Sequence, residues 1–201
     1  MKLGIYGGAF NPVHNAHVII AIKVLERLNL DKLIIVPTYI PPHRSTRDFA
    51  PYEYRKKWVE IVFEGIKNIY VSSFEKEKGG VSYSIETVKF FLEKYGVKPF
   101  FIIGEDSAIS FDRWYRYKDL KKLARFVVYP RFKESKFDII KKVHPEFLTL
   151  EDLPLIEISS TEVRERIRQG RSIRGMVDRR IEGEIIERYE KIFKKERGEY
   201  K

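Results

Sequence analysis

Residues 7–17 read GGAFNPVHNAH, and this stretch decides how the start of the chain folds. Apolar residues precede the two glycines within residues 3–6 and recur at helical spacing within residues 18–28. The stretch is therefore predicted to be the turn from a first strand into a first helix. Glycine lets a backbone approach an anion closely, and a helix start offers unpaired N–H groups and the positive end of a dipole. We expect this turn to bind phosphate.

Two histidines, His14 and His17, flank the start of the predicted helix. Because they are three residues apart, both lie on one side of the first turn and can face whatever the glycine turn binds. Imidazole nitrogens can donate hydrogen bonds that follow charge during a reaction. A glycine turn beside two surface histidines is the ordinary alternative. The chain has only 4 histidines, however, and two of them at this spacing favour an enzyme that acts on a nucleotide.

A second predicted helix start lies late in the chain, at residues 158–164, which read ISSTEVR. Ser159 begins an S-x-x-E capping box, and Ser160 and Thr161 place hydroxyl groups beside the free N–H groups of the first turn. Arg164 lies one turn further along, where its guanidinium can reach the same anion with two N–H groups. Capping residues are also common in helices that bind nothing. It is the combination with the first loop that favours a second phosphate site.

Short apolar runs alternate with amphipathic stretches between these two ends. The apolar runs cover residues 33–37, 69–72, 100–104 and 126–130, and the amphipathic stretches cover roughly 52–65, 83–95 and 105–123. Nearly unbroken apolar runs are typical of parallel strands covered on both faces. The predicted fold class is α/β, a Rossmann-like doubly wound parallel sheet, in which ligands bind outside the carboxyl ends of the strands.

The length of 201 residues suits one such domain over residues 1–201, with no linker, repeat or low-complexity tract to divide it. A C-terminal amphipathic helix of about residues 178–197 is expected to dock on this domain. The N-terminus has no signal-peptide pattern, and no apolar run approaches the roughly 20 residues that cross a bilayer. We therefore expect a cytoplasmic protein without a membrane partner.

Composition limits the chemistry. With no cysteine, disulfides, a thiol nucleophile and a cysteine metal site are excluded. The net charge of +10 suits anionic ligands. The Lys and Arg residues are mixed with 29 acidic residues, which is more typical of solvated helix faces than of a stripe that binds nucleic acid. No nucleic-acid partner is predicted, and the sequence leaves the oligomeric state open.

The first loop resembles the loop of the nucleotidyltransferase superfamily that reads G-G-x-F-D-P-x-H-x-G-H. The positions that match it are Gly7, Gly8, Phe10, Pro12, His14 and His17. Ala9, Asn11 and Ala16 depart from it, standing where the motif usually has Thr or Ser, Asp, and Gly. Residues 158–164 match a second motif, I-S-S-T-x-[IV]-R, which the resemblance implies holds the β- and γ-phosphates of ATP.

An enzyme of this superfamily joins ATP to a second substrate, and three segments in the middle of the chain are candidates for binding it. They are PPHR at residues 41–44, SYSIET at residues 82–87, and GEDS at residues 104–107 with WYRY at residues 114–117. Each has an ordinary structural explanation: a loop proline pair, a helix cap, and aromatic side chains packed in the core. Their combination and order are similar to the nicotinate-nucleotide adenylyltransferases, whose pattern includes P-P-H-[KR], S-Y-[ST]-x-x-T, G-x-D and W-Y-x-[WY].

This resemblance implies transfer of the adenylyl group of ATP to nicotinate mononucleotide in NAD biosynthesis, with nicotinate adenine dinucleotide and pyrophosphate as products. It implies catalytic roles for His14, His17 and Arg164. The residues implied to bind ATP are Gly7, Gly8, Ala9, Phe10, His14, His17, Gly104, Asp106, Ile158, Ser159, Ser160, Thr161 and Arg164. Those implied to bind the mononucleotide are Arg44, Ser84, Thr87, Trp114 and Tyr115. No protein metal ligand is predicted, and Mg²⁺ is expected to arrive on the ATP phosphates.

Two alternatives stay open. The acceptor could be nicotinamide mononucleotide or another phosphorylated compound such as phosphopantetheine, or the chain could be a basic α/β module that binds nucleotides or nucleic acid without catalysis. The His14–His17 pair together with Arg164 favours the enzyme, because a binding module has no need to combine them. The segment around Trp114 offers N–H groups and no side-chain acceptor for an amide, which favours the acid form of the mononucleotide.

Overall fold

The computed structural model describes residues 1–42, 48–196 and 198, and these residues form a six-stranded parallel sheet. The strands are β1 (Leu3–Gly8), β2 (Lys32–Pro37), β3 (Ile69–Val71), β4 (Phe100–Gly104), β5 (Arg125–Tyr129) and β6 (Leu148–Thr149). Their order is β3-β2-β1-β4-β5-β6, which reverses between β1 and β4. The predicted doubly wound α/β fold in a single domain is confirmed, and its ligand site is expected at that reversal.

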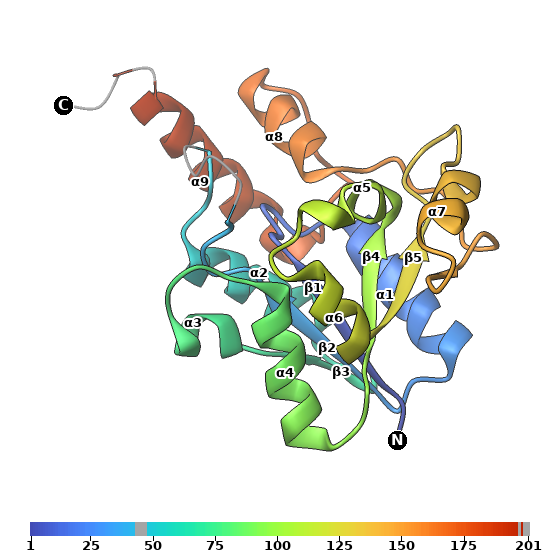
Figure 1. Ribbon diagram of the computed structural model, residues 1–201. Coiled ribbons are helices and arrows are strands. Elements are labelled where there is room, and N and C mark those ends of the chain that lie inside the picture. The colour runs from blue at the N-terminus through green and yellow to red at the C-terminus, as the bar shows by residue number, and fades with distance from the viewer. Residues whose placement is uncertain (43–47, 197, 199–201) are drawn as a thin grey trace.

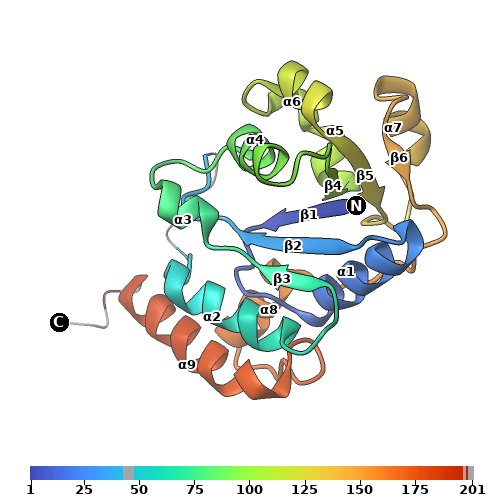
Figure 2. The ribbon, with the colours of Figure 1, turned by 90° about the horizontal axis from the view of Figure 1, so that it is seen from below.

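Helices cover both faces of the sheet (Figure 2). One face carries α1 (Asn15–Leu28), α2 (Tyr52–Phe63), α8 (Ser160–Arg168) and α9 (Arg179–Glu196). The other carries α4 (Ser84–Tyr95), α5 (Glu105–Ile109), the 3-10 helix η1 (Phe111–Arg113), α6 (Tyr117–Leu123) and α7 (Phe137–Val143), and α3 (Phe74–Lys78) follows β3. Each face has its own buried apolar cluster, as the unbroken apolar strands predict.

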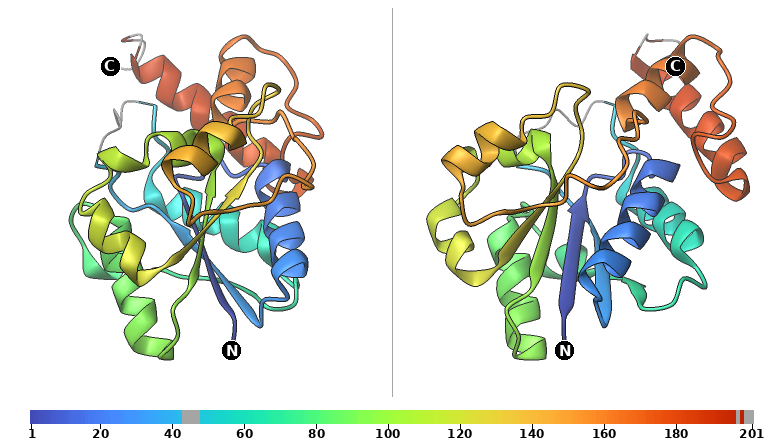
Figure 3. Two further views of the ribbon diagram at one scale, coloured as in Figure 1. Left: turned by 45° about the vertical axis from the view of Figure 1, so that its right-hand side comes forward. Right: turned by 90° about the vertical axis from the view of Figure 1, so that its right-hand side faces the viewer.

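The C-terminal helix predicted at about residues 178–197 is α9, and it packs against α2 and α8. Its buried side chains recur every four residues, at Ile181, Ile185, Tyr189 and Phe193. This stripe joins the core cluster that contains α1 and α2. Figures 1 and 3 show α8 and α9 at the end of the sheet opposite to the N-terminus, where the strands present their carboxyl ends.

The amphipathic stretch at residues 105–123 is helical, as its spacing predicts, but it is not one continuous helix. The structure has three short helices there, α5, η1 and α6, because the chain turns at Ser110 and again before α6, where Arg116 has a positive φ of 54°. The turns let Phe111 and Trp114 pack on each other, with ring centroids 5.2 Å apart, and let Trp114 meet Phe101 of β4. The short elements α3, α7 and β6 had no prediction.

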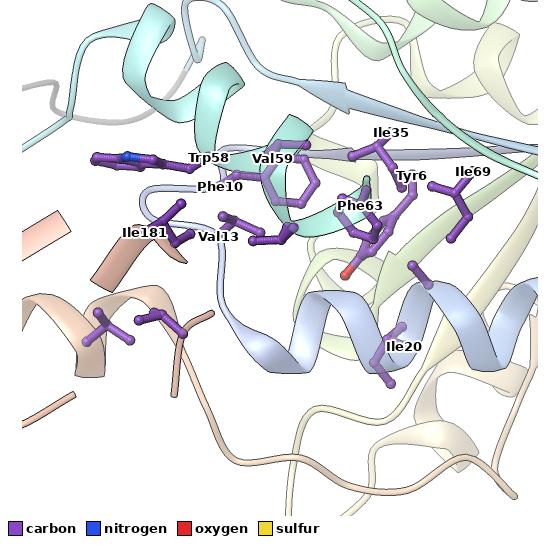
Figure 4. Packing of buried hydrophobic residues seen from close by; sticks show 14 of the residues in the cluster. Tyr6, Phe10, Val13, Ile20, Ile35, Trp58, Val59, Phe63, Ile69 and Ile181 are labelled. Atoms are coloured by element: carbon purple, nitrogen blue, oxygen red, sulfur yellow. The ribbon is translucent and has the colours of Figure 1, made fainter. Parts of the chain in front are cut away.

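The first loop differs from its prediction in one respect. Gly7 and Gly8 are the last two residues of β1, where they pair with Val36 and Pro37, so the turn itself comprises residues 9–14. Phe10 and Val13 anchor this turn, because their buried side chains join the cluster formed by α2 and α9 (Figure 4). A Cβ atom at position 8 would lie 3.1 Å from the Phe10 ring, so glycine there leaves room for the close packing of that ring.

Candidate active site

A cavity of about 700 Å³ opens at the carboxyl ends of β1 and β4, where the strand order reverses. Its volume lies in the range of small-molecule sites. It brings together most of the residues singled out from the sequence: Gly7, Gly8, Ala9, Phe10, His14, His17, Ser84, Thr87, Gly104, Asp106, Trp114, Tyr115, Ser159, Ser160, Thr161 and Arg164. Segments from both ends of the chain and from its middle therefore form one site.

Two of the predicted site residues differ from this set. Ile158 does not line the cavity: its side chain packs against the core, and its carbonyl oxygen lies 3.5 Å from the Nη1 of Arg131. Arg44 lies outside the described residues, as does His43 beside it. Pro41 and Pro42 of the same motif line the cavity.

The two histidines stack on each other at the start of α1, with ring centroids 3.7 Å apart. His14 is the N-cap residue, and its backbone N–H donates to the Nδ1 of His17 over 3.1 Å. Because Nδ1 of His17 accepts this bond, the neutral ring carries its hydrogen on Nε2. His17 therefore offers the cavity a fixed N–H donor.

Burial keeps both imidazoles neutral. It lowers the pKa of His14 from 6.5 to about 3, with Arg131 as a second cause. The pKa of His17 is lowered well below its usual range, first by burial and then by the neighbouring His14 and Arg131. Negative charge entering the cavity acts in the opposite direction: it raises the pKa of both histidines and so favours the protonated rings, in which both nitrogens can donate.

Helix α8 is fastened directly to the first loop. The hydroxyl of Ser160 donates to the carbonyl oxygen of Pro12 over 2.8 Å, and the Nη1 of Arg164 donates to the carbonyl oxygen of Asn11, also over 2.8 Å. Ser159 caps the helix as predicted, because its hydroxyl accepts the N–H of Glu162 at 3.1 Å. The two helix starts predicted to grip one anion thus lie against each other.

The Arg164 guanidinium is only partly available to a ligand. Its Nε donates to Asp48 Oδ2 over 2.8 Å and its Nη1 bonds Asn11, while Nη2 lies 3.5 Å from the Thr161 hydroxyl. Nη2 is therefore the nitrogen with the most freedom to meet an anion. Asp48 also lines the cavity, and nothing in its local sequence distinguishes it from a surface loop acid.

Asn11, which departs from the superfamily motif, lies at the centre of a buried network. Its Nδ2 donates to the carbonyl oxygen of Asp48, and its Oδ1 accepts from the backbone N–H of Ala50 and from the Tyr189 hydroxyl, at 3.0, 2.9 and 2.7 Å. An aspartate could accept the last two bonds but could not donate the first. The amide therefore ties the first loop to α9 and to the segment before α2.

Arg131 is a site residue that the sequence interpretation missed. It follows β5, lines the cavity, and lowers the pKa values of both histidines. The buried carboxylate of Glu105 holds its loop by accepting the N–H groups of Arg131, Phe132 and Lys136 at 2.7, 3.1 and 2.7 Å. A Cβ atom at position 104 would come within 2.7 Å of the Arg131 side chain and 2.5 Å of the Asp106 carboxylate, so both side chains would have to move to admit it. The sequence signal that could have identified Arg131 is its position directly after the apolar run at residues 126–130, at the carboxyl end of a predicted strand.

The opposite end of the cavity is aromatic. Trp114 packs its ring against Phe111 and Phe101 and also lines the cavity, so core packing and a ligand surface are both present. Tyr115 is exposed and its ring lies 4.4 Å from that of Tyr83. Ser84 begins α4 and Thr87 lies in its first turn. This end can hold a flat ring, whereas the histidine end can hold phosphate.

Within residues 1–42, 48–196 and 198, no group of three or more His, Asp or Glu side chains is arranged to hold a metal ion. The same residues contain no helix long and apolar enough to span a membrane. Three carboxylates line the cavity: Asp48 is engaged by Arg164 and Glu75 by Thr87, which leaves Asp106 as the third. A cation bound here would therefore find most of its oxygen ligands on a phosphate ligand and on water.

Known proteins similar to this chain identify its family. Residues 5–166 match the cytidylyltransferase-like family. The chain is 45% identical over 187 residues to a Thermotoga maritima protein named "Probable nicotinate-nucleotide adenylyltransferase", covering 92% of this chain and 90% of that protein. It is also 45% identical over 193 residues to the Pseudothermotoga lettingae protein of the same name, covering 94% and 96%.

The fold matches a solved enzyme more distant in sequence. The structure of Plasmodium falciparum nicotinic acid mononucleotide adenylyltransferase complexed with NaAD superposes with a TM-score of 0.78 at 18% identity, covering 96% of each chain. At that identity the likeness concerns the fold alone.

Proposed function

The chain belongs to the nicotinate-nucleotide adenylyltransferases within the cytidylyltransferase-like family, and from this premise we propose that it transfers the adenylyl group of ATP to nicotinate mononucleotide. The 5′-phosphate of the mononucleotide attacks the α-phosphorus of ATP, and the bond to pyrophosphate breaks. The products are nicotinate adenine dinucleotide and pyrophosphate. The observation that carries the proposal is the single cavity with two helix starts at one end and an aromatic wall at the other.

His17 is the proposed transition-state donor. In-line phosphoryl transfer needs positioning and donors directed at oxygens whose charge grows, and no covalent enzyme intermediate. The Nε2 of His17 fits this role because its Nδ1 is already fixed by the backbone of His14. His14, which is neutral and 3% exposed, serves as the second phosphate donor.

The remaining ATP contacts follow from the lining of the cavity. We assign the β- and γ-phosphates to the start of α8, with Thr161 and the Nη2 of Arg164, and we add Arg131 as a further cation at the phosphates. Gly104 and Asp106 at the end of β4 are assigned to the adenosine. Ile158 contributes through its backbone at most, since its side chain packs in the core.

Mg²⁺ is proposed to enter with ATP, where it would neutralise charge on the phosphate oxygens. The histidine end of the cavity, which we call the phosphate end, is compatible with a metal ion that is bound mainly by ATP. Its residues are neutral or cationic donors, and the Asp48 carboxylate is paired with Arg164. The protein's own part is to orient the triphosphate and to leave its α-phosphorus open to the acceptor.

The acceptor is assigned to the aromatic end of the cavity. Trp114 and Tyr115 are proposed to hold the pyridine ring, with Ser84 and Thr87 at its polar edge, and Arg44 stays the candidate for the mononucleotide phosphate. A carboxylate substituent needs N–H donors, which backbone groups of these segments can supply. Nicotinate is therefore proposed over nicotinamide. The cytoplasmic location stays a prediction.

The test compares acceptors directly. Purified protein with ATP and Mg²⁺ is expected to release pyrophosphate with nicotinate mononucleotide at a kcat/KM at least about tenfold above that with nicotinamide mononucleotide, a difference of about 1.4 kcal/mol. Equal efficiency with both would overturn the acid preference. No turnover with either would overturn the proposed reaction.

A further inference from the structure

The aromatic end of the cavity, assigned above to the acceptor and called the acceptor end from here on, contains a buried carboxylate that has no assigned role. Glu75 lies in the short helix α3, lines the cavity and is only 6% exposed. A buried carboxylate is costly unless donors surround it. The role of Glu75 can therefore be inferred from the groups that donate hydrogen bonds to it.

Three segments meet at Glu75. Its Oε1 accepts the hydroxyl hydrogen of Thr87 in α4 over 2.9 Å, and its Oε2 accepts the backbone N–H of Tyr39 over 3.2 Å. The Ser82 hydroxyl accepts the N–H groups of Tyr39 and Ile40 at 3.1 and 3.2 Å, and it lowers the pKa of the Glu75 carboxyl. One carboxylate thus fixes the exit of β2, residue 82 and the first turn of α4 relative to each other.

Burial is the largest influence on the Glu75 carboxyl and raises its pKa above the ordinary value, while Ser82, Thr87 and Tyr39 act in the opposite direction. The backbone N–H of Tyr39 can only donate, and the Thr87 hydroxyl donates to Oε1. Glu75 therefore serves as the common acceptor for both segments.

A buried cation completes the arrangement on the other side of the same peptide segment. Arg55 in α2, 2% exposed, donates to the carbonyl oxygens of Thr38 and Ala9 over 2.7 Å each and to that of Tyr39 over 3.3 Å. Residues 38–40 therefore lie between two buried charged side chains. The Glu75 carboxylate accepts the N–H of Tyr39, and the Arg55 guanidinium donates to the C=O groups of Thr38 and Tyr39. This segment leads directly to Pro41 and Pro42, which line the cavity.

The bond to Thr87 also sets the polarity of one wall of the acceptor end. A threonine hydroxyl has one hydrogen, and Thr87 gives it to Glu75. The Thr87 oxygen can then only accept hydrogen bonds from the cavity, such as one from a ribose hydroxyl of the mononucleotide, so the nicotinate carboxylate would take its donors from backbone N–H groups. The orientation of the Thr87 hydroxyl depends on the Glu75 carboxylate beside it in the same wall.

We propose that Glu75 is a positioning residue for the acceptor mononucleotide, fixing Thr87 and the exit of β2 as one rigid wall of the acceptor subsite. The inference rests on the proposed function, because it assumes that this end of the cavity takes the mononucleotide. Glu75 acts through its neighbours, and ATP at the other end of the cavity does not depend on it.

Glu75→Gln tests the role. A glutamine amide has one acceptor oxygen where the carboxylate has two, so it cannot accept from Thr87 and from Tyr39 in the same way. The KM for nicotinate mononucleotide is expected to rise about tenfold or more, while the KM for ATP changes less than about twofold, as loss of a bond to a charged group predicts. Glu77→Gln, an exposed acid in the same helix, is the matched control and leaves both KM values as they are.

A second pair of variants covers the case in which Glu75→Gln does not fold. Thr87→Val keeps the side-chain shape and removes the donor, and its acceptor KM is expected to rise about as much; Thr87→Ser keeps the donor and recovers most of that loss. In the double variant the two effects are expected not to add, because both break one bond. Melting temperatures are recorded for every variant.

Two results would overturn the inference while the proposed function stands. One is an unchanged acceptor KM in Glu75→Gln and Thr87→Val; the other is an equal rise of both KM values, which would mark a general structural role. If the wild-type protein does not use nicotinate mononucleotide at all, the proposed function is overturned first, and this inference with it.

Discussion

The two ends of the cavity are built in opposite ways. The phosphate end is formed by short motifs near the two chain termini, joined by direct bonds such as those from Ser160 to Pro12 and from Arg164 to Asn11. The acceptor end is assembled from α3, α4 and the residues around η1, with the buried carboxyl group of Glu75 in its wall. Donors and cations line one end, whereas aromatic rings and a fixed acceptor line the other. From this difference we expect the chemical step and the recognition of the acceptor to be separable by mutation.

The largest effect should come from the phosphate end. His17→Ala removes the donor proposed for the transition state, so kcat is expected to fall on the order of 10²–10³-fold, as for loss of a preorganised donor. The acceptor KM should change by less than about threefold if the two ends are separable. Steady-state kinetics with both substrates varied measure this, with circular dichroism as the check on folding. A loss in kcat smaller than about fivefold would remove the assigned role of His17.

The converse test addresses the aromatic end. Trp114→Ala should raise the KM for nicotinate mononucleotide roughly 10- to 100-fold, because it removes a ring that contributes about 1–3 kcal/mol by stacking and apolar contact. Trp114→Phe should keep part of that contact. ATP affinity, measured by calorimetry, should stay within about threefold in both variants. Weakened ATP binding equal to the acceptor loss would show that the two ends are not independent.

Acid should weaken the phosphate end through its histidines. Folded His14 has a pKa of about 3, whereas its ordinary value is 6.5, so the unfolded chain binds a proton that the folded chain refuses. The stability contribution is fully present above pH 6.5 and is lost as the pH falls toward 3. Between pH 7 and pH 5, His14 alone should lower the free energy of unfolding by about 2 kcal/mol.

Urea unfolding of the unliganded protein at several pH values measures this slope. His14→Asn, which removes the titrating group, should flatten it over the same range. An identical slope in the variant would mean that the imidazole is not held neutral by its surroundings.

The smallest expected effect concerns the Asn11 network. Asn11→Asp should destabilise the protein by about 1–2 kcal/mol, since it loses the bond from Nδ2 to the Asp48 carbonyl oxygen and places a carboxylate against it. Tyr189→Phe, which removes one bond to the same side chain, is the comparison variant. Urea unfolding at pH 7 measures both. Wild-type stability in Asn11→Asp would show that the amide has no structural advantage over the acid usual in the superfamily.

The phosphate end could be predicted from sequence because its geometry is local. His14 and His17 share one helical turn, and Ser159 caps a helix three residues before Glu162, so spacing alone fixes their relative positions. The strands could be predicted for a similar reason, since parallel strands covered on both faces are continuous apolar runs. That the two helix starts meet was implied by the resemblance of both segments to motifs that bind one ATP, and the bond from Ser160 to Pro12 accounts for it.

The rest could not be predicted because it depends on tertiary packing. Glu75 and Glu77 lie in the same short charged helix, and only the fold buries one and exposes the other. The break before α6 depends on Arg116 adopting a positive φ so that Trp114 can reach Phe101. The partners of Arg164, Asp48 and the carbonyl of Asn11, come from distant segments and leave less of its guanidinium free than the motif alone indicates.

A crystal structure of the protein with a non-hydrolysable ATP analogue and Mg²⁺ would show directly whether both helix starts bind one triphosphate. The triphosphate is expected to lie between the imidazole of His17 and the first turn of α8, within about 3.2 Å of the Nε2 of His17 and of a donor in residues 160–164. The α-phosphorus should face the aromatic end. A triphosphate bound by only one of these two helix starts, with the other facing solvent, would contradict this expectation.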